Sequence, residues 1–294
     1  MNNWYTCTSD ISEVPRLKEI WKLAFGDEDA YIDRFFELYY RPERVMTLHA
    51  EDAIPSAIHT FDMRAIVMPD GSEFSAGVTY ALGTDPKYRG HDYGMKCMDA
   101  ALAMQAQMGR DCSIQVPAND TLFVQYHKRI GYCDAFYVKE AHIPCTDIGT
   151  ADGEIVRVGW QRYGELRESL LDGLCHVAFD DEGLRYQEVL CQDADGGLYE
   201  LSVNGYTGCA TVELLPEDTV FVKELLIDDS VIKEALAVIA EQYPGRDYIV
   251  RTPSDRGDPL GGEVRRFAMA KFFGEKAGYT LDRSLNAYFG LAYD

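Results

Sequence analysis

The sequence repeats itself over a distance of 136 residues. Gly109 and Gly245 each end a helix-like stretch, and Pro117 and Pro253 each close a strand-like one, so both pairs have this same spacing. A further strand-like run precedes each helix-like stretch, in which apolar residues recur at helical spacing. A strand–helix–strand unit that occurs twice predicts a duplicated α/β domain.

The length of 294 residues fits two domains, because one compact domain usually takes about 150. We place the domains at 1–147 and 148–294, with the join in a polar stretch. The first half opens with two helix patterns followed by three strand patterns of an antiparallel meander. The fold class that we expect is α/β, in the α+β layered sense, and each domain has a mixed, mostly antiparallel sheet flanked by helices.

Net charge and cysteine usage limit the classes of partner and the kinds of site that the chain can have. The chain has 28 Lys and Arg against 49 Asp and Glu, a net charge of −21, which would repel a nucleic-acid backbone or an anionic membrane but suits a cationic amine. The eight cysteines include no C-x-x-C pair, so they predict no metal site. The sequence also has no secretory leader pattern and no apolar run of about 18 residues. We expect a cytoplasmic protein with reduced thiols and no membrane contact.

The two copies differ in the loop between strand and helix. In the first copy a polar, glycine-bearing loop runs from Asp85 to Gly94, whereas the second copy passes from Ile227 to Ser230 with almost no loop. The fold therefore does not need the longer loop. A glycine-bearing turn that enters a helix N-terminus collects free N–H groups and the positive end of the helix dipole, so it predicts a site for a phosphate or pyrophosphate.

This loop resembles the acyl-CoA loop of the GCN5-related N-acetyltransferases (GNAT). The family pattern of Arg or Gln, two residues, Gly, one residue, and Gly or Ala is similar to the run Tyr88–Gly94, and the strand before it and Pro117-Ala118-Asn119 after it also match in order. The similarity covers about residues 14–140. The second half resembles a degenerate second copy that shapes the acceptor cleft, as in the tandem or Eis-like members.

The resemblance implies acetyl-CoA as cosubstrate and a set of residues that bind it. Strand backbone would bind the pantetheine arm, loop N–H groups would hold the pyrophosphate, and an amide side chain would reach the same arm; these residues are Leu82, Gly83 and Thr84, then Arg89, Gly90, His91, Asp92, Tyr93 and Gly94, then Asn119. Asp92 departs from the family, which has glycine there. Its carboxylate would repel a pyrophosphate, unless the left-handed backbone that Asp tolerates turns it outward.

The resemblance also implies direct attack of an amine on a thioester, assisted by an acid and a base. Counting forward from Pro117 makes Tyr126 the acid, while counting backward from Gly131 makes it His127. The motif strand has no carboxylate to serve as base, and His59 and Asp62 lie on the strand before it. The chain ends in an apolar, strand-like segment, which suggests a docked terminus. We therefore hypothesise that the α-carboxylate of Asp294 is the base.

Together these patterns predict an acyl-CoA-dependent N-acetyltransferase that acts on a primary amine. The alternative is a catalytically impaired GNAT-fold protein that binds CoA or another protein. Asp92 is the residue that separates the two, because it determines whether the loop accepts a pyrophosphate.

Overall fold

The computed structural model describes residues 4–50 and 55–292, and the chain divides into two compact units. Unit 1 comprises Met1–Arg64, Phe74–Cys133 and Met269–Thr280, and unit 2 comprises Ala65–Glu73, Asp134–Ala268 and Leu281–Asp294. The predicted boundary between residues 147 and 148 divides the sequence once. The compact units divide it several times, because each unit takes up segments from both halves of the chain.

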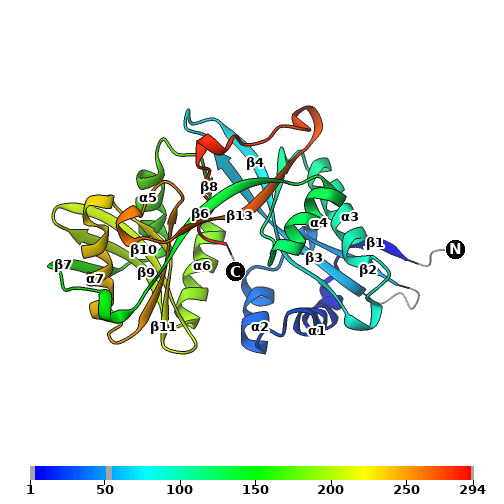
Figure 1. The fold of residues 1–294 in the computed structure, drawn as a ribbon. Coiled ribbons are helices and arrows are strands. Elements are labelled where there is room, and N and C mark those ends of the chain that lie inside the picture. Colours follow the sequence, from blue (N-terminus) through cyan, green and yellow to red (C-terminus); the bar gives the residue numbers. More distant parts are fainter. Residues whose placement is uncertain (1–3, 51–54, 293–294) are drawn as a thin grey trace. The chain divides into compact units, whose positions relative to one another are not determined.

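Unit 1 is built on a mixed sheet with the strand order β1-β2-β3-β4-β5-β13. Its strands are β1 (Tyr5–Thr8), β2 (Val45–His49), β3 (Pro55–Val67), β4 (Glu73–Thr84), β5 (Cys112–Gln115) and the last residues of β13 (Glu263–Phe272). The pairs β1–β2, β2–β3 and β5–β13 are antiparallel, while β4 and β5 are parallel. Both faces of the sheet carry helices (Figure 1).

Those helices are α1 (Val14–Phe25), α2 (Asp29–Leu38), α3 (Tyr93–Gln107) and α4 (Asp120–Ile130). The α1 and α2 helices pack on one face, where Trp21 and Phe35 surround the ring of Tyr80 from β4. On the other face, Met98 of α3 and Phe123 of α4 form an apolar cluster. The pattern of apolar residues predicted α1 closely, because Gly26 ends it in a left-handed conformation with φ +79°.

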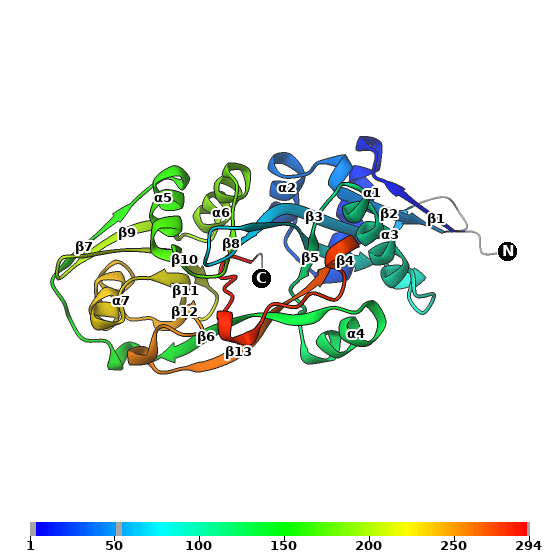
Figure 2. The ribbon, with the colours of Figure 1, turned by 90° about the horizontal axis from the view of Figure 1, so that it is seen from above.

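Unit 2 has the strand order β6-β12-β11-β10-β9-β7, and β8 pairs separately with the end of β3. Its strands are β6 (Cys133–Ile143), β7 (Gly153–Arg157), β8 (His176–Ala178), β9 (Gly197–Val203), β10 (Tyr206–Leu215), β11 (Thr219–Leu226) and β12 (Asp247–Pro253). Its helices are α5 (Trp160–Leu171), α6 (Asp181–Asp193) and α7 (Ile232–Gln242). In Figure 2, α5 and α6 lie on one face of this sheet and α7 on the other.

The predicted repeat corresponds to the same supersecondary unit in both units. In unit 1, β4, α3 and β5 form a parallel strand–helix–strand unit, and in unit 2, β11, α7 and β12 do the same. The mixed, mostly antiparallel α/β architecture is therefore as predicted. None of the helices in the described residues is long and apolar enough to span a bilayer.

The C-terminal segment differs from its prediction. Residues Ala287–Ala292 are almost all fully buried in unit 2, but they form no regular strand. Tyr288 makes one isolated bridge with His176; its N–H lies 2.9 Å from the carbonyl oxygen of Cys175. The apolar residues of this segment thus belong to the core of unit 2. Gly290 lies so close to Tyr288 that a Cβ at position 290 would overlap the Tyr288 hydroxyl. Asp294 lies outside the described residues.

Candidate active site

The parallel strands β4 and β5 separate before β4 ends. Their register covers only Ala76–Val78 of β4 against Cys112–Ile114 of β5, although β4 continues to Thr84. Ala81 has φ +53°, which is a left-handed backbone inside a strand and marks a bulge. The last residues of β4 consequently leave β5 with backbone groups that could pair with a ligand.

The predicted loop follows directly and is fixed at its start by Asp85. This buried carboxylate caps the 3-10 turn Pro86–Tyr88 by accepting a hydrogen bond of 2.8 Å from the N–H of Lys87. It also pairs with Arg16 of α1, whose Nε donates to the Pro55 carbonyl oxygen at 3.1 Å. The guanidinium is a principal cause of the lowered pKa of the Asp85 carboxyl. These contacts of Asp85 therefore fix the position of the start of the loop.

The loop then enters α3 through two glycines. Gly90 has φ +85°, a conformation that glycine adopts without strain. At Gly94 a Cβ would lie 3.0 Å from the Thr84 hydroxyl oxygen, so the helix starts close to the end of β4. The first turn of α3 presents its N–H groups here, and Lys87, Arg89 and Lys96 supply positive charge. Free N–H groups and positive charge of this kind suit an anion.

Asp92 occupies the N-cap position of α3 in the left-handed region, with φ 63° and ψ 22°. Its side chain makes no capping hydrogen bond. Instead, one carboxylate oxygen lies 2.5 Å from a guanidinium nitrogen of Arg129 on α4, and about half of each side chain is exposed. The structure thus gives Asp92 the backbone conformation that a glycine would adopt there, and it pairs the charge with a neighbouring cation.

Tyr126 and His127 lie on α4 but face different surroundings. Tyr126 is 5% exposed and packs in one cluster with Leu82 of β4 and Met98 of α3. Its hydroxyl forms no hydrogen bond with any described residue, and burial raises its pKa to about 12. His127 is exposed, and its Nδ1 lies 2.8 Å from the Tyr132 carbonyl oxygen at the end of the helix. Of the two residues, only Tyr126 packs in the cluster that includes Leu82 of β4.

The structure either buries each of the remaining predicted residues or gives it a structural role. Asn119 caps α4, because its side-chain oxygen accepts a hydrogen bond of 3.1 Å from the N–H of Leu122. His59 is fully buried, neither ring nitrogen has a hydrogen-bond partner among the described residues, and burial lowers its pKa to about 4. Asp62 is 3% exposed and pairs with two arginines. The structure therefore leaves neither His59 nor Asp62 as an accessible base.

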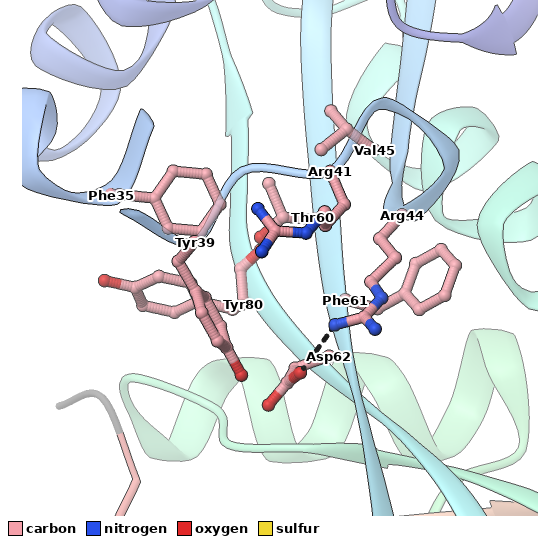
Figure 3. Close-up of a pocket in the computed structure, with 9 residues that line it drawn as sticks. All are labelled: Phe35, Tyr39, Arg41, Arg44, Val45, Thr60, Phe61, Asp62 and Tyr80. Carbon is pink, nitrogen blue, oxygen red and sulfur yellow. Dashed lines mark hydrogen bonds and ion pairs between the residues drawn. The ribbon is translucent and has the colours of Figure 1, made fainter. Parts of the chain in front are cut away.

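Sequence reasoning missed a small hollow on the α1–α2 face of the unit 1 sheet. Its lining consists of Phe35, Tyr39, Arg41, Arg44, Val45, Thr60, Phe61, Asp62 and Tyr80 (Figure 3). One signal was present in the sequence: Thr60, Asp62 and Arg64 alternate along a strand whose other residues are mostly apolar. Such an alternation places polar groups together on one face of the strand, where they need partners.

Comparison with known proteins identifies a family for the first part of the chain. Residues 8–133 match the model of an acetyltransferase (GNAT) domain. This part of the chain belongs to the GNAT family. The match includes β4, the loop, α3, β5 and α4. GNAT membership supports acyl transfer as the general activity.

The solved structures that resemble the chain extend the likeness to both units. A conserved protein from Enterococcus faecalis V583, described as a probable N-acyltransferase, shares 15% identity with a TM-score of 0.69, over 92% of this chain and 73% of its own. A GCN5-related N-acetyltransferase from Kribbella flavida shares 13% identity with a TM-score of 0.68, over 92% and 72%. Eis1 from Mycobacterium abscessus shares 13% with a TM-score of 0.63, over 92% and 73%. No curated protein matches the chain in sequence.

Proposed function

We propose that this protein is an acetyl-CoA-dependent N-acetyltransferase that transfers an acetyl group to a primary amine by direct attack. The observation that carries the proposal is the joining of two features in unit 1. One is the strand end at Leu82–Thr84, which β5 does not pair, and the other is the cationic, glycine-bearing entry into α3. The first suits the amides of a pantetheine arm and the second suits a pyrophosphate.

In this proposal the backbone of Leu82, Gly83 and Thr84 binds the arm as an added strand. The N–H groups from Arg89 to Gly94 hold the pyrophosphate, and the amide of Asn119 lies at the start of α4 near the same arm. Acetyl-CoA would supply the activated acyl group. Family membership supports this choice of cosubstrate.

Tyr126 is the proposed acid, and the α-carboxylate of Asp294 is the proposed base. The amine loses a proton to the base as its nitrogen forms a bond with the carbonyl carbon. The carbon–sulfur bond then breaks, and the Tyr126 hydroxyl donates a hydrogen bond to the departing thiolate, which takes its proton from solvent on release. A phenol with a pKa of about 12 holds its proton at neutral pH, so it is always ready to donate.

The proposed acceptor is a small-molecule amine, which is cationic at neutral pH until the base removes its proton. A second candidate, a GNAT-fold protein that binds CoA weakly without turnover, is favoured by one observation. The Asp92 carboxylate stands at the point where a pyrophosphate would meet the helix, and it would oppose the ligand's charge.

Thermal unfolding with and without acetyl-CoA, followed by thiol release across a panel of amines, tests both candidates. A binding enzyme gains stability of about RT ln(1 + [L]/Kd) and releases CoA thiol when an acceptor is present. A thermal shift without thiol release from any amine would favour the CoA-binding candidate. The absence of any shift at millimolar acetyl-CoA would contradict both.

Removal of Tyr293 and Asp294 tests the base. We expect thiol release to stop while the melting temperature and the shift with acetyl-CoA persist. Unchanged turnover after this deletion would exclude the C-terminal carboxylate. An amide-for-acid change at the Asp294 side chain provides the control, because it leaves the α-carboxylate in place.

A further inference from the structure

The α4 helix of unit 1 has no counterpart in unit 2. In unit 1, α4 follows β5, the second strand of the repeated strand–helix–strand unit, and packs Phe123, Tyr126 and Ile130 in one cluster with residues of α3. In unit 2, the equivalent strand β12 leads to β13 through residues 254–262, which form only the short 3-10 helix Asp258–Leu260. The second copy of the repeat therefore lacks its last helix.

An open groove occupies the corresponding place beside α7. In unit 1, α4 lies on the side of α3 toward β5 and β13, since Met269 of β13 belongs to the same apolar cluster. In unit 2, Ile143 at the end of β6, the strand next to β12, lines the groove. Val238 on the other flank of α7 faces β7, where a Cβ at Gly153 would lie 2.8 Å from it. The sheet orders therefore place the groove where the missing helix would lie.

This α7 groove is lined by α7 between Lys233 and Ala237, by the end of β6 with the segment that follows it, and by Pro259 and Leu260. Its open volume is about 450 Å³. That volume lies within the range of roughly 300–1,000 Å³ that ligand clefts span. The α7 groove thus has room for several side chains of a bound partner.

The floor of the α7 groove is apolar and continues the core of unit 2. Leu236 of α7 is 2% exposed and belongs to the core cluster, and Ile143, Ile148 and Leu260 pack against that cluster while staying partly exposed. A partner that covers these side chains would remove apolar surface from water, which favours binding.

The walls of the α7 groove favour a cationic partner. Glu234 in the first turn of α7 and Asp147 after β6 form no ion pair with any described residue, and Lys233 is the one Lys or Arg of the lining. The lining therefore carries more negative than positive charge. Unit 1 shows the same kind of pairing in place, because Arg129 in the last turn of α4 lies 2.5 Å from Asp92 at the start of α3.

We propose that the α7 groove binds an amphipathic, cationic helix of another protein. Apolar residues at positions i, i+3 and i+7 of that helix enter the groove, as Phe123, Tyr126 and Ile130 of α4 enter the cluster of unit 1. Lys or Arg near the C-terminal end of the helix pairs with Glu234 and Asp147. This interaction surface goes beyond the proposed function and does not depend on acyl transfer.

A peptide with the sequence of residues 118–131 of this chain is the probe, because it carries the apolar face and the cations of α4. It is titrated into the full-length protein by fluorescence anisotropy, and hydrogen exchange locates the contact. We expect a dissociation constant in the tens to hundreds of micromolar, since a short isolated helix must form on binding, with protection of α7 and residues 142–150. A peptide with serine at the positions of Phe123, Tyr126 and Ile130 should not bind.

Charge reversal tests the pairing. The double variant Asp147→Lys and Glu234→Lys should bind the peptide about tenfold more weakly. A peptide with glutamate in place of Lys128 and Arg129 should bind this double variant more tightly than it binds wild type. Glu241→Lys, exposed on the same helix but outside the α7 groove, is the matched control and should keep the affinity. Thermal unfolding checks that each variant folds.

Several results would overturn the inference. One is the absence of binding at about 1 mM peptide. Another is equal affinity for wild type and the double variant, or protection confined to unit 1, which would mean that the peptide exchanges with α4 itself. A third is a dimer of this chain in sedimentation experiments that the double variant dissociates, since the α7 groove would then belong to a second copy.

Discussion

Replacing Tyr126 by phenylalanine removes one oxygen atom from a side chain that is 5% exposed. No described residue forms a hydrogen bond with that oxygen, and burial raises the pKa of the hydroxyl to about 12. The substitution therefore leaves the hydrogen bonds of the folded chain intact and keeps the ring that packs beside Leu82 and Met98. What it removes is a hydroxyl that no other part of the described chain uses.

The substitution should change the rate and leave stability almost unchanged. No hydrogen bond within the described chain is lost with the Tyr126 hydroxyl, so Tyr126→Phe should alter the free energy of unfolding by less than about 1 kcal/mol. General acid assistance contributes about 10²–10⁴-fold, so kcat should fall by that factor. A thiol with an ordinary pKa of about 8.5 is a stronger acid than this phenol. The rate loss therefore measures mainly the hydrogen bond that the hydroxyl donates to the developing thiolate.

Steady-state thiol release, thermal unfolding and the shift with acetyl-CoA are the three measurements. Tyr132→Phe is the matched control, because Tyr132 is fully buried in the same apolar cluster and donates a hydrogen bond of 2.9 Å to the hydroxyl of Ser113. We expect Tyr132→Phe to lose about 1 kcal/mol of stability and to keep its kcat.

The reasoning about Tyr126 would be refuted by a kcat within threefold of wild type in a variant that still binds acetyl-CoA. It would be refuted equally if Tyr126→Phe lost as much stability as Tyr132→Phe, since the hydroxyl would then have a structural partner.

Three further predictions concern the loop, a buried histidine and the C-terminal segment. Asp92→Asn, which keeps the left-handed backbone but removes the charge paired with Arg129, should tighten acetyl-CoA two- to tenfold, or about 0.5–1.5 kcal/mol, in a titration; weaker binding would contradict the repulsion. The buried ring of His59 stays neutral down to pH about 4, whereas the unfolded ring takes a proton near pH 6.5. Wild type should therefore lose about 2 kcal/mol more than His59→Leu between pH 7 and pH 5 in urea unfolding, and equal losses would contradict that pKa. Gly290→Ala places a Cβ against the hydroxyl of Tyr288 and should cost about 1–3 kcal/mol, so an unchanged unfolding midpoint would mean that the segment shifts without strain.

The sequence predicted the elements around the loop because their signals are local. A glycine ends α1, a turn joins β3 to β4, and the apolar face of α3 repeats at helical spacing, so each boundary depends on residues within one or two turns. The left-handed conformation of Asp92 was foreseeable for the same reason. Asp is one of the few residues that adopts it readily, and the loop needed it where the family has glycine.

Features that depend on distant pairing were not predictable in this way. The hollow requires Arg44, from the turn before β2, to meet Asp62 in β3, and no spacing in the sequence encodes that contact. The prediction of a strand at the C-terminus was wrong for a related reason. An apolar run fits a buried strand and a buried irregular segment equally well. Only the surroundings of Gly290 decide between them.

The last residues of β13, which belong to unit 1 although they come late in the sequence, have a consequence for how the protein is made. The edge of β5 pairs with Met269–Phe272, which the ribosome delivers about 140 residues after α4. At roughly 5–20 residues per second, this delay lasts on the order of ten to thirty seconds. During that time the newly made first part of the chain exposes the unpaired edge of β5, and exposed strand edges tend to aggregate. Synthesis speed and chaperone protection over this interval, rather than the stability of the finished sheet, should therefore limit the yield of active protein.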